Sequence, residues 1–133
     1  MTPKDVFRQV LESGDMHLRA YTADMTDADL LVRSVPGSNH AAWQLGHMVV
    51  GTSHMLTALG RPPIELPEGF AAAHSAENSA SDDAGRFAKK AEYLALLDKA
   101  KSAIRQRAAS ISCRTVASSI STERSSRSSI TCR

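Results

Sequence analysis

The sequence predicts an all-α fold, a single domain built as a bundle of long helices. Aromatic residues make up only 5% of the chain, so the core must rest on aliphatic, methionine and alanine side chains, which suit packed helices better than a β-sandwich. Apolar positions recur every three or four residues in two long segments, and a third segment is largely apolar and free of charge. At 133 residues the chain is long enough for one modest hydrophobic core.

The first expected helix begins at Thr2, with Pro3 at the first helical position and Asp5 completing a capping box. Its apolar positions alternate in spacings of four and three, which places them on one stripe of an amphipathic helix of about six turns. The stripe consists of Phe7, Leu11, Gly14, Leu18, Tyr21 and Met25.

The second expected helix runs from about His40 to Leu59, with Ser38 or Asn39 as its cap and Gly60 at its end. No aspartate, glutamate, lysine or arginine interrupts it. A helix that is apolar on nearly all sides is typical of the central, buried member of a bundle. We therefore expect its histidines, and His47 in particular, to lie in the protein interior.

Residues 61–82 form a long connection rich in proline, alanine and serine, and connections of this length are often functional or mobile. A third helix is expected to start near Ser81 and to continue through Phe87 to about Ile104, where apolar residues again recur every three or four positions. Its lysines and arginines form a solvated face.

The composition changes at residue 110, so we divide the chain into a helical domain, residues 1–109, and a low-complexity segment, residues 110–133. Nine serines and four arginines occupy these last 24 positions, and no fourth helix is evident. Such a composition favours disorder, because it cannot repay the entropy of ordering. An arginine- and serine-rich binding tail and a shifted reading frame after about codon 107 are the alternatives.

The formal net charge of +2 conceals two unequal parts. Residues 1–109 carry 12 Lys and Arg against 13 Asp and Glu, a net of −1, whereas residues 110–133 carry four arginines against one glutamate, a net of +3. A near-neutral body gives no electrostatic indication of nucleic-acid binding. Since neither a signal peptide nor a membrane span is evident, we expect a cytoplasmic protein. The cysteines, Cys113 and Cys132, are weak evidence for a disulfide or a metal site.

Three histidines of the second helix, His40, His47 and His54, are spaced by seven residues. That spacing corresponds to about 10.5 Å of helix rise, so no two of them can bind one ion at about 2 Å from each ring. For His40 and His54 we expect structural roles. His47 is the candidate metal ligand, because it lies mid-helix beside Trp43, and Gly51 one turn away leaves space next to the ring. The alternative explanation is that Gly46 and Gly51 simply allow close packing of the helices.

A Pro-Gly turn and the start of the second expected helix form the run Val35-Pro36-Gly37-Ser38-Asn39-His40-Ala41-Ala42-Trp43-Gln44-Leu45-Gly46-His47. This run resembles the start of the second helix in DinB/YfiT-like proteins, and more general similarity extends from about Asp5 to Arg107. The resemblance implies an up-down-down-up four-helix bundle, often dimeric, that holds zinc or nickel through three histidines. In family members of known chemistry, the metal activates a small thiol for transferase or isomerase reactions. The matching first ligand is His47.

This sequence departs from the family pattern at the remaining ligands, which come from a His-x-x-x-His pair on the last helix. No histidine follows His74, and three helices rather than four are evident. His17 and His74 could complete a site only if folding happens to bring them to it. Two hypotheses result. The chain is a divalent-metal-binding DinB-like protein with an incomplete site, or it is a non-catalytic helical domain that dimerises or binds a protein partner.

Overall fold

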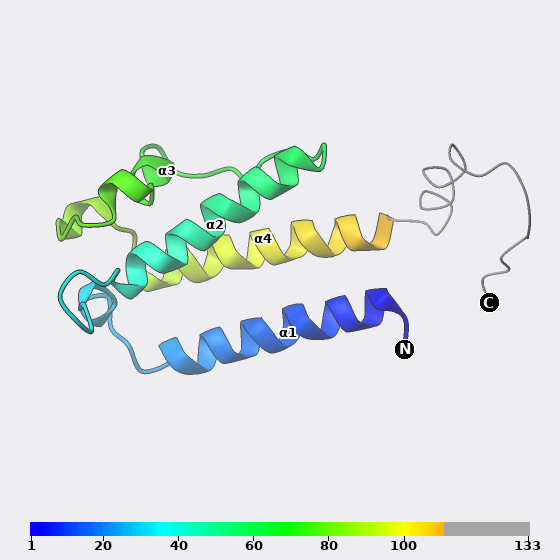
Figure 1. Ribbon diagram of the computed structural model, residues 1–133, viewed down its shortest axis with the longest axis horizontal. Coiled ribbons are helices and arrows are strands. Elements are labelled where there is room, and N and C mark those ends of the chain that lie inside the picture. The colour runs from blue at the N-terminus through cyan, green and yellow to red at the C-terminus, as the bar shows by residue number, and fades with distance from the viewer. Residues whose placement is uncertain (111–133) are drawn as a thin grey trace, which may run out of the picture.

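Three long helices lie side by side in the computed structural model, which describes residues 1–110, with side chains up to residue 107. Helix α4 runs between α1 and α2 and contacts both (Figure 1). The described residues contain no strand, which confirms the predicted all-α bundle with three long helices. The helices are α1 (Pro3–Thr22), α2 (Ala41–Ala58), α3 (Phe70–Ala73) and α4 (Lys90–Ser110), and the 3-10 turns are Asp29–Leu31, Ala76–Asn78 and Ala84–Arg86.

The hydrophobic core lies mainly between α2 and α4, and the connecting segments close it at one end. Phe70 of α3 and Leu30 of the first 3-10 turn pack into this core. A smaller cluster of Leu56, Ile64 and Ala100 lies toward the other end of α2 and α4. The packing buries one side of α2 only, because the described elements all contact that side. The expectation that α2 is buried on nearly all sides is therefore wrong.

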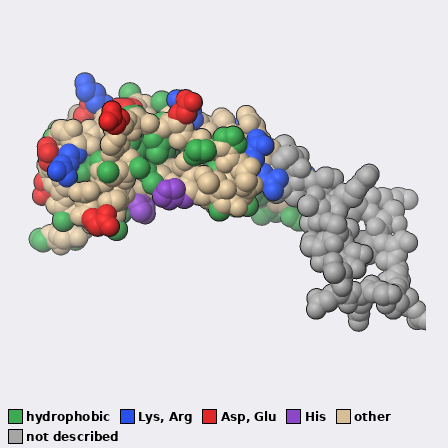
Figure 2. All heavy atoms as spheres, turned by 90° about the horizontal axis from the view of Figure 1, so that it is seen from above, with side chains coloured by type: hydrophobic (Ala, Val, Ile, Leu, Met, Phe, Trp, Pro, Cys, Tyr) green, Lys and Arg blue, Asp and Glu red, His purple; other side chains and the backbone are tan. Residues whose placement is uncertain are grey.

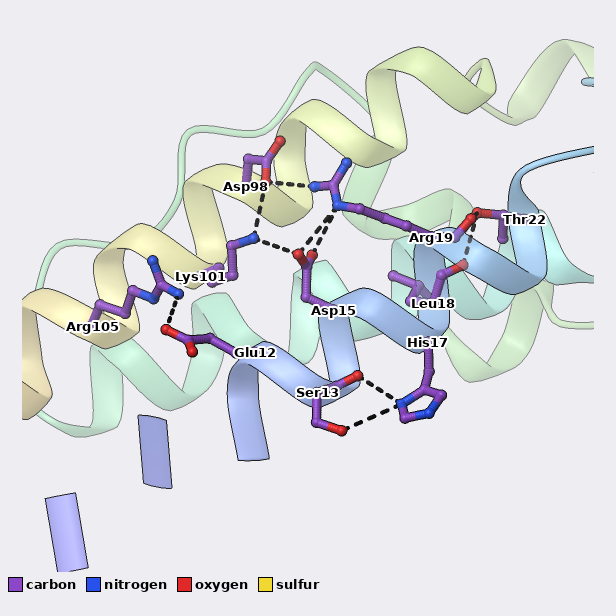
Figure 3. A network of polar contacts seen from close by, with 10 residues as sticks. All are labelled: Glu12, Ser13, Asp15, His17, Leu18, Arg19, Thr22, Asp98, Lys101 and Arg105. Carbon is purple, nitrogen blue, oxygen red and sulfur yellow. Dashed lines mark hydrogen bonds and ion pairs between the residues drawn. The ribbon is translucent and has the colours of Figure 1, made fainter. Parts of the chain in front are cut away.

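Helix α1 begins as predicted, since Thr2 caps it, Pro3 opens it and Asp5 completes the capping box. Its contact with α4 is largely ionic (Figure 3). Asp15 of α1 accepts hydrogen bonds from Lys101 at 2.6 Å and from Arg19 at 3.2 Å. Two more pairs join the helices, Arg19–Asp98 at 2.6 Å and Glu12–Arg105 at 2.8 Å.

The apolar stripe of α1 is less buried than its spacing suggests. Leu11 and Leu18 are half-buried, but Phe7 is 44% exposed and Tyr21 is 74% exposed. The charged side of α1 packs against α4. The apolar stripe lies beside that contact, where no described element fully covers it. Periodicity correctly indicates which residues share a face, but it does not say what lies against that face.

Helix α4 begins at Lys90 rather than near Ser81, so the predicted start is wrong. Asp83 accepts a hydrogen bond from the Gly85 amide and caps only a 3-10 turn. The Lys90 amide instead donates to Asp27 at 2.7 Å, a partner 63 residues away in the sequence. The helix thus takes its N-terminal partner from the segment that follows α1.

The long connection carries more structure than expected. It contains α3, which Gly69 precedes in the left-handed region at φ 75°, and a 3-10 turn. Arg33 holds the C-terminal end of this connection. It donates hydrogen bonds to Asp82 at 2.7 Å and to the carbonyls of Ser79 and Ser81 at 3.1 Å each. Within the described part of the chain, no helix has the length and apolar character needed to cross a membrane.

Candidate functional site

His40 is the N-cap of α2, in place of the predicted Ser38 or Asn39. Its Nδ1 accepts a hydrogen bond from the Trp43 amide at 3.1 Å, and its Nε2 donates to the Ser81 carbonyl at 3.3 Å. Burial lowers the pKa of His40, which keeps the ring neutral and able to accept. Both nitrogens are occupied, so His40 has the structural role expected of it.

His74, which the sequence places in a connection, is one of the most buried side chains of the described protein. Its Nδ1 donates to the Phe70 carbonyl at 2.7 Å, and its Nε2 accepts from the Tyr93 hydroxyl at 2.8 Å. The Tyr93 oxygen in turn accepts from the Ala88 amide at 3.1 Å. Burial raises the pKa of Tyr93 to about 12 and lowers the pKa of His74, so the phenol keeps its proton and the imidazole stays neutral.

Gly46 makes room for the His74 ring. A Cβ atom at position 46 would lie 2.1 Å from Cδ2 and 2.2 Å from Nε2 of that ring, a separation that real atoms do not reach. No such contact exists at Gly51, where the space is open. The two glycines of α2 therefore have different surroundings. Gly46 allows the His74 side chain to pack against α2, rather than another helix backbone.

His47 lies on the outer side of α2 and is exposed, so the prediction that its ring is in the protein interior is wrong. The ring is nevertheless held in place. It stacks on Trp43 with centroids 4.5 Å apart and planes 13° apart, and its Nδ1 bonds the His74 carbonyl at 3.0 Å. Since a carbonyl can only accept, Nδ1 carries the hydrogen and the Nε2 lone pair is available. Trp43 adds a bond from Nε1 to the Ser75 carbonyl at 3.1 Å.

This arrangement of His47 is the one that metal-binding histidines usually have, with the second ring nitrogen donating to a backbone carbonyl. The remaining ligands of a complete site are missing from the described residues, where no group of three or more His, Cys, Asp or Glu side chains could hold one ion. His17 lies on α1, exposed, with its Nδ1 bonded to the Ser13 carbonyl at 2.7 Å. Cys113 and Cys132 lie outside the described residues.

The exposed half of α2 carries no charged side chain. Apolar and histidine side chains lie together on the surface of the molecule (Figure 2). On the α1 side they border a groove of about 430 Å³, whose walls include Phe7, Leu11, Met55, Leu59 and Ile104. The exposed residues of α2 are Gln44, His47, Met48, Gly51, His54, Met55, Thr57 and Ala58.

The pattern of residue types did not identify His74 or Tyr93 as part of the site. Gly46, which directly precedes His47, is the sequence feature that relates to them. A glycine in this helix does not by itself indicate a close contact, because Gly51 of the same helix has open space where its Cβ would be. Only the path of the connection shows that a ring approaches Gly46.

The family model described as the DinB superfamily matches residues 11–123. Searches of curated proteins and of solved structures gave no match.

Proposed function

Because the chain belongs to the DinB superfamily, we propose that it is a divalent-metal-binding helical domain in which His47 supplies one ligand. One observation carries the proposal. The His74 carbonyl fixes the tautomer of His47 and leaves Nε2 free at the surface. Trp43 limits the rotation of the ring by stacking on it, which lowers the entropy lost on binding a cation.

The histidines of the described residues differ in whether the fold orients the ring and leaves one ring nitrogen free. His40 and His74 use both ring nitrogens within the fold, so neither can bind a metal without breaking a buried hydrogen bond. His54 makes no hydrogen bond to the described residues, so nothing orients its ring. His47 combines an oriented ring with a free nitrogen and a neighbouring aromatic face.

Zinc and nickel are the cations that suit an imidazole ligand and that the family resemblance implies. The described residues supply one ordered ligand rather than three, so they do not by themselves form the three-ligand site that a catalytic metal needs. The proposal therefore extends to cation binding and not to thiol-dependent transfer.

Zinc titration of the full chain, followed by calorimetry and by the imidazole nitrogen resonances in NMR, tests this proposal. We expect the Nε2 resonance of His47 to shift on addition of zinc, and His47→Ala to weaken binding at least tenfold. His17→Ala is the matched control, since His17 is also exposed with Nδ1 on a carbonyl but lies on another helix. Equal affinity in His47→Ala and the unchanged chain would refute the proposal.

A further inference from the structure

The groove bordered by α1, α2 and α4 is a strongly apolar recess at one end of the molecule. The first turns of α1 and the last turns of α2 and α4 lie together there (Figure 1). Phe7, Met55 and Leu59 line the groove, and each is about half exposed, so apolar surface meets water there. The volume of about 430 Å³ falls within the range of about 300–1,000 Å³ that small-molecule sites have. A ligand with an apolar body that displaces this water is therefore favoured.

The charged side chains of the groove are all of one sign. Among the described residues that line it, Lys4 and Arg107 are the charged ones, and both are cations. Two carboxylates follow closely in the sequence of α1, but both are engaged elsewhere. Asp5 accepts a hydrogen bond from the Thr2 amide at 2.9 Å as part of the α1 cap, and Glu12 pairs with an arginine of α4 at 2.8 Å. The lining is therefore net positive, which favours a ligand that carries a negative charge.

The charged and apolar parts of the groove lie at different positions along the helices. Lys4 belongs to the first turn of α1 and Arg107 to the last turn of α4, and these two helix ends are neighbours (Figure 1). From Pro3 to Leu11 the groove follows about 12 Å of α1, since each residue of a helix adds about 1.5 Å. A matching ligand has an anionic head at the helix ends and an apolar tail that extends toward Leu11.

Protein segments match this lining less well than a small amphiphile does. A second copy that meets the groove by the same face brings another Lys4 and another Arg107, and like charges repel. Residues 111–133 carry four arginines against one glutamate, a net of +3, which has the same sign as the lining. Charge therefore selects a small anionic molecule as the occupant.

We propose that the groove binds a medium-chain fatty acid, with the carboxylate at Lys4 and Arg107 and the alkyl chain along the apolar walls. An extended chain advances about 1.2 Å per bond, so an alkyl chain of about ten carbons spans the groove. An ammonium and a guanidinium donate charge-assisted hydrogen bonds to a carboxylate, and each methylene buried against the walls adds to the affinity. The inference does not depend on His47, which is not part of the lining.

Calorimetric titration of the full chain with decanoate tests the proposal. Decanol has the same alkyl chain without the charge, decyltrimethylammonium has the opposite charge, and butyrate has the carboxylate on a short chain. We expect decanoate to bind at least tenfold more tightly than decanol or butyrate, and decyltrimethylammonium to give no measurable binding. This order follows because the groove recognises both the tail and the negative head.

Two pairs of variants locate the site. Met55→Glu places a carboxylate in the groove and should weaken decanoate binding at least tenfold. Met48→Glu is the matched control, since Met48 is as exposed on the same helix but does not line the groove, and it should leave the affinity unchanged. Lys4→Gln should weaken decanoate about threefold, as expected for one exposed ion pair, and leave decanol unchanged. Its control is Arg8→Gln, which removes a cation of α1 outside the lining. Circular dichroism establishes that each variant keeps its helices.

Three results would overturn the proposal. The first is a full chain that binds no decanoate, whether a second copy or residues 111–133 occupy the groove instead. The second is decanol binding as tightly as decanoate, which contradicts the role of the cations. The third is equal weakening by Met55→Glu and Met48→Glu, which contradicts the location. None of these results bears on zinc binding through His47, so failure here is distinguishable from failure of the proposed function.

Discussion

Gly46→Ala would test whether the His74 ring depends on the missing side chain of residue 46. The added methyl group would lie 2.1 Å from Cδ2 and 2.4 Å from Cγ of His74, so the ring must move. The ring has little freedom to do so, because two hydrogen bonds of 2.7 and 2.8 Å hold its nitrogens and Phe70 lies 4.2 Å from its centroid.

The expected loss of stability can be estimated from these contacts. Displacement of the ring weakens one or two buried hydrogen bonds, each of which contributes about 1–1.5 kcal/mol. Overpacking of the core costs a further 1–3 kcal/mol or so. Alanine gains about 1 kcal/mol over glycine in a helix, which offsets part of the loss. We expect Gly46→Ala to lower the free energy of unfolding by about 3 kcal/mol, a large share of the roughly 5–15 kcal/mol of a typical domain.

Urea denaturation followed by circular dichroism measures this change, and Gly51→Ala is the matched control. Both glycines lie within α2, but Gly51 has open space where its Cβ would be. Gly51→Ala should therefore be neutral or stabilise the chain by up to about 1 kcal/mol. If the two variants have the same stability, then the His74 ring is not packed against residue 46.

Two further predictions concern hydrogen bonds of the core and of the α2 cap. Tyr93→Phe leaves His74 without a donor and the Ala88 amide without an acceptor. It should lower the free energy of unfolding by about 1–3 kcal/mol, measured by thermal or urea denaturation. The control Tyr21→Phe, at the surface, should leave it unchanged. His40 caps α2 only while neutral, and burial lowers its pKa, so its contribution to stability is complete above a pH of about 6.5 and is lost as the pH falls below that value. Urea midpoints measured between about pH 7.5 and pH 5 should fall for the unchanged chain and fall less for His40→Asn, which caps without titrating. His74, whose pKa burial also lowers, keeps its share of the pH dependence in both chains. Equal slopes would contradict the assignment.

Short-range features were predictable from the sequence because their causes lie within three or four residues. The capping box of Thr2 and Asp5 joins side chains to backbone amides three residues apart, and the end of α2 before Gly60 is equally local. The all-α fold follows from apolar spacing in the same way. His47 was identified as the residue of interest from its place beside Trp43, and the structure does place the two rings in contact.

The tertiary structure alone decided which partners meet across long distances in the chain. The connection after α2 brings the His74 carbonyl to His47, 27 residues away, and the segment after α1 brings Asp27 to the start of α4. The tertiary structure also decided that one half of α2 is covered and the other is not. His47, which was expected in the interior, therefore lies at the surface. A helix pattern specifies which residues share a face, whereas the molecule that contacts that face depends on the path of the rest of the chain, which no local rule contains.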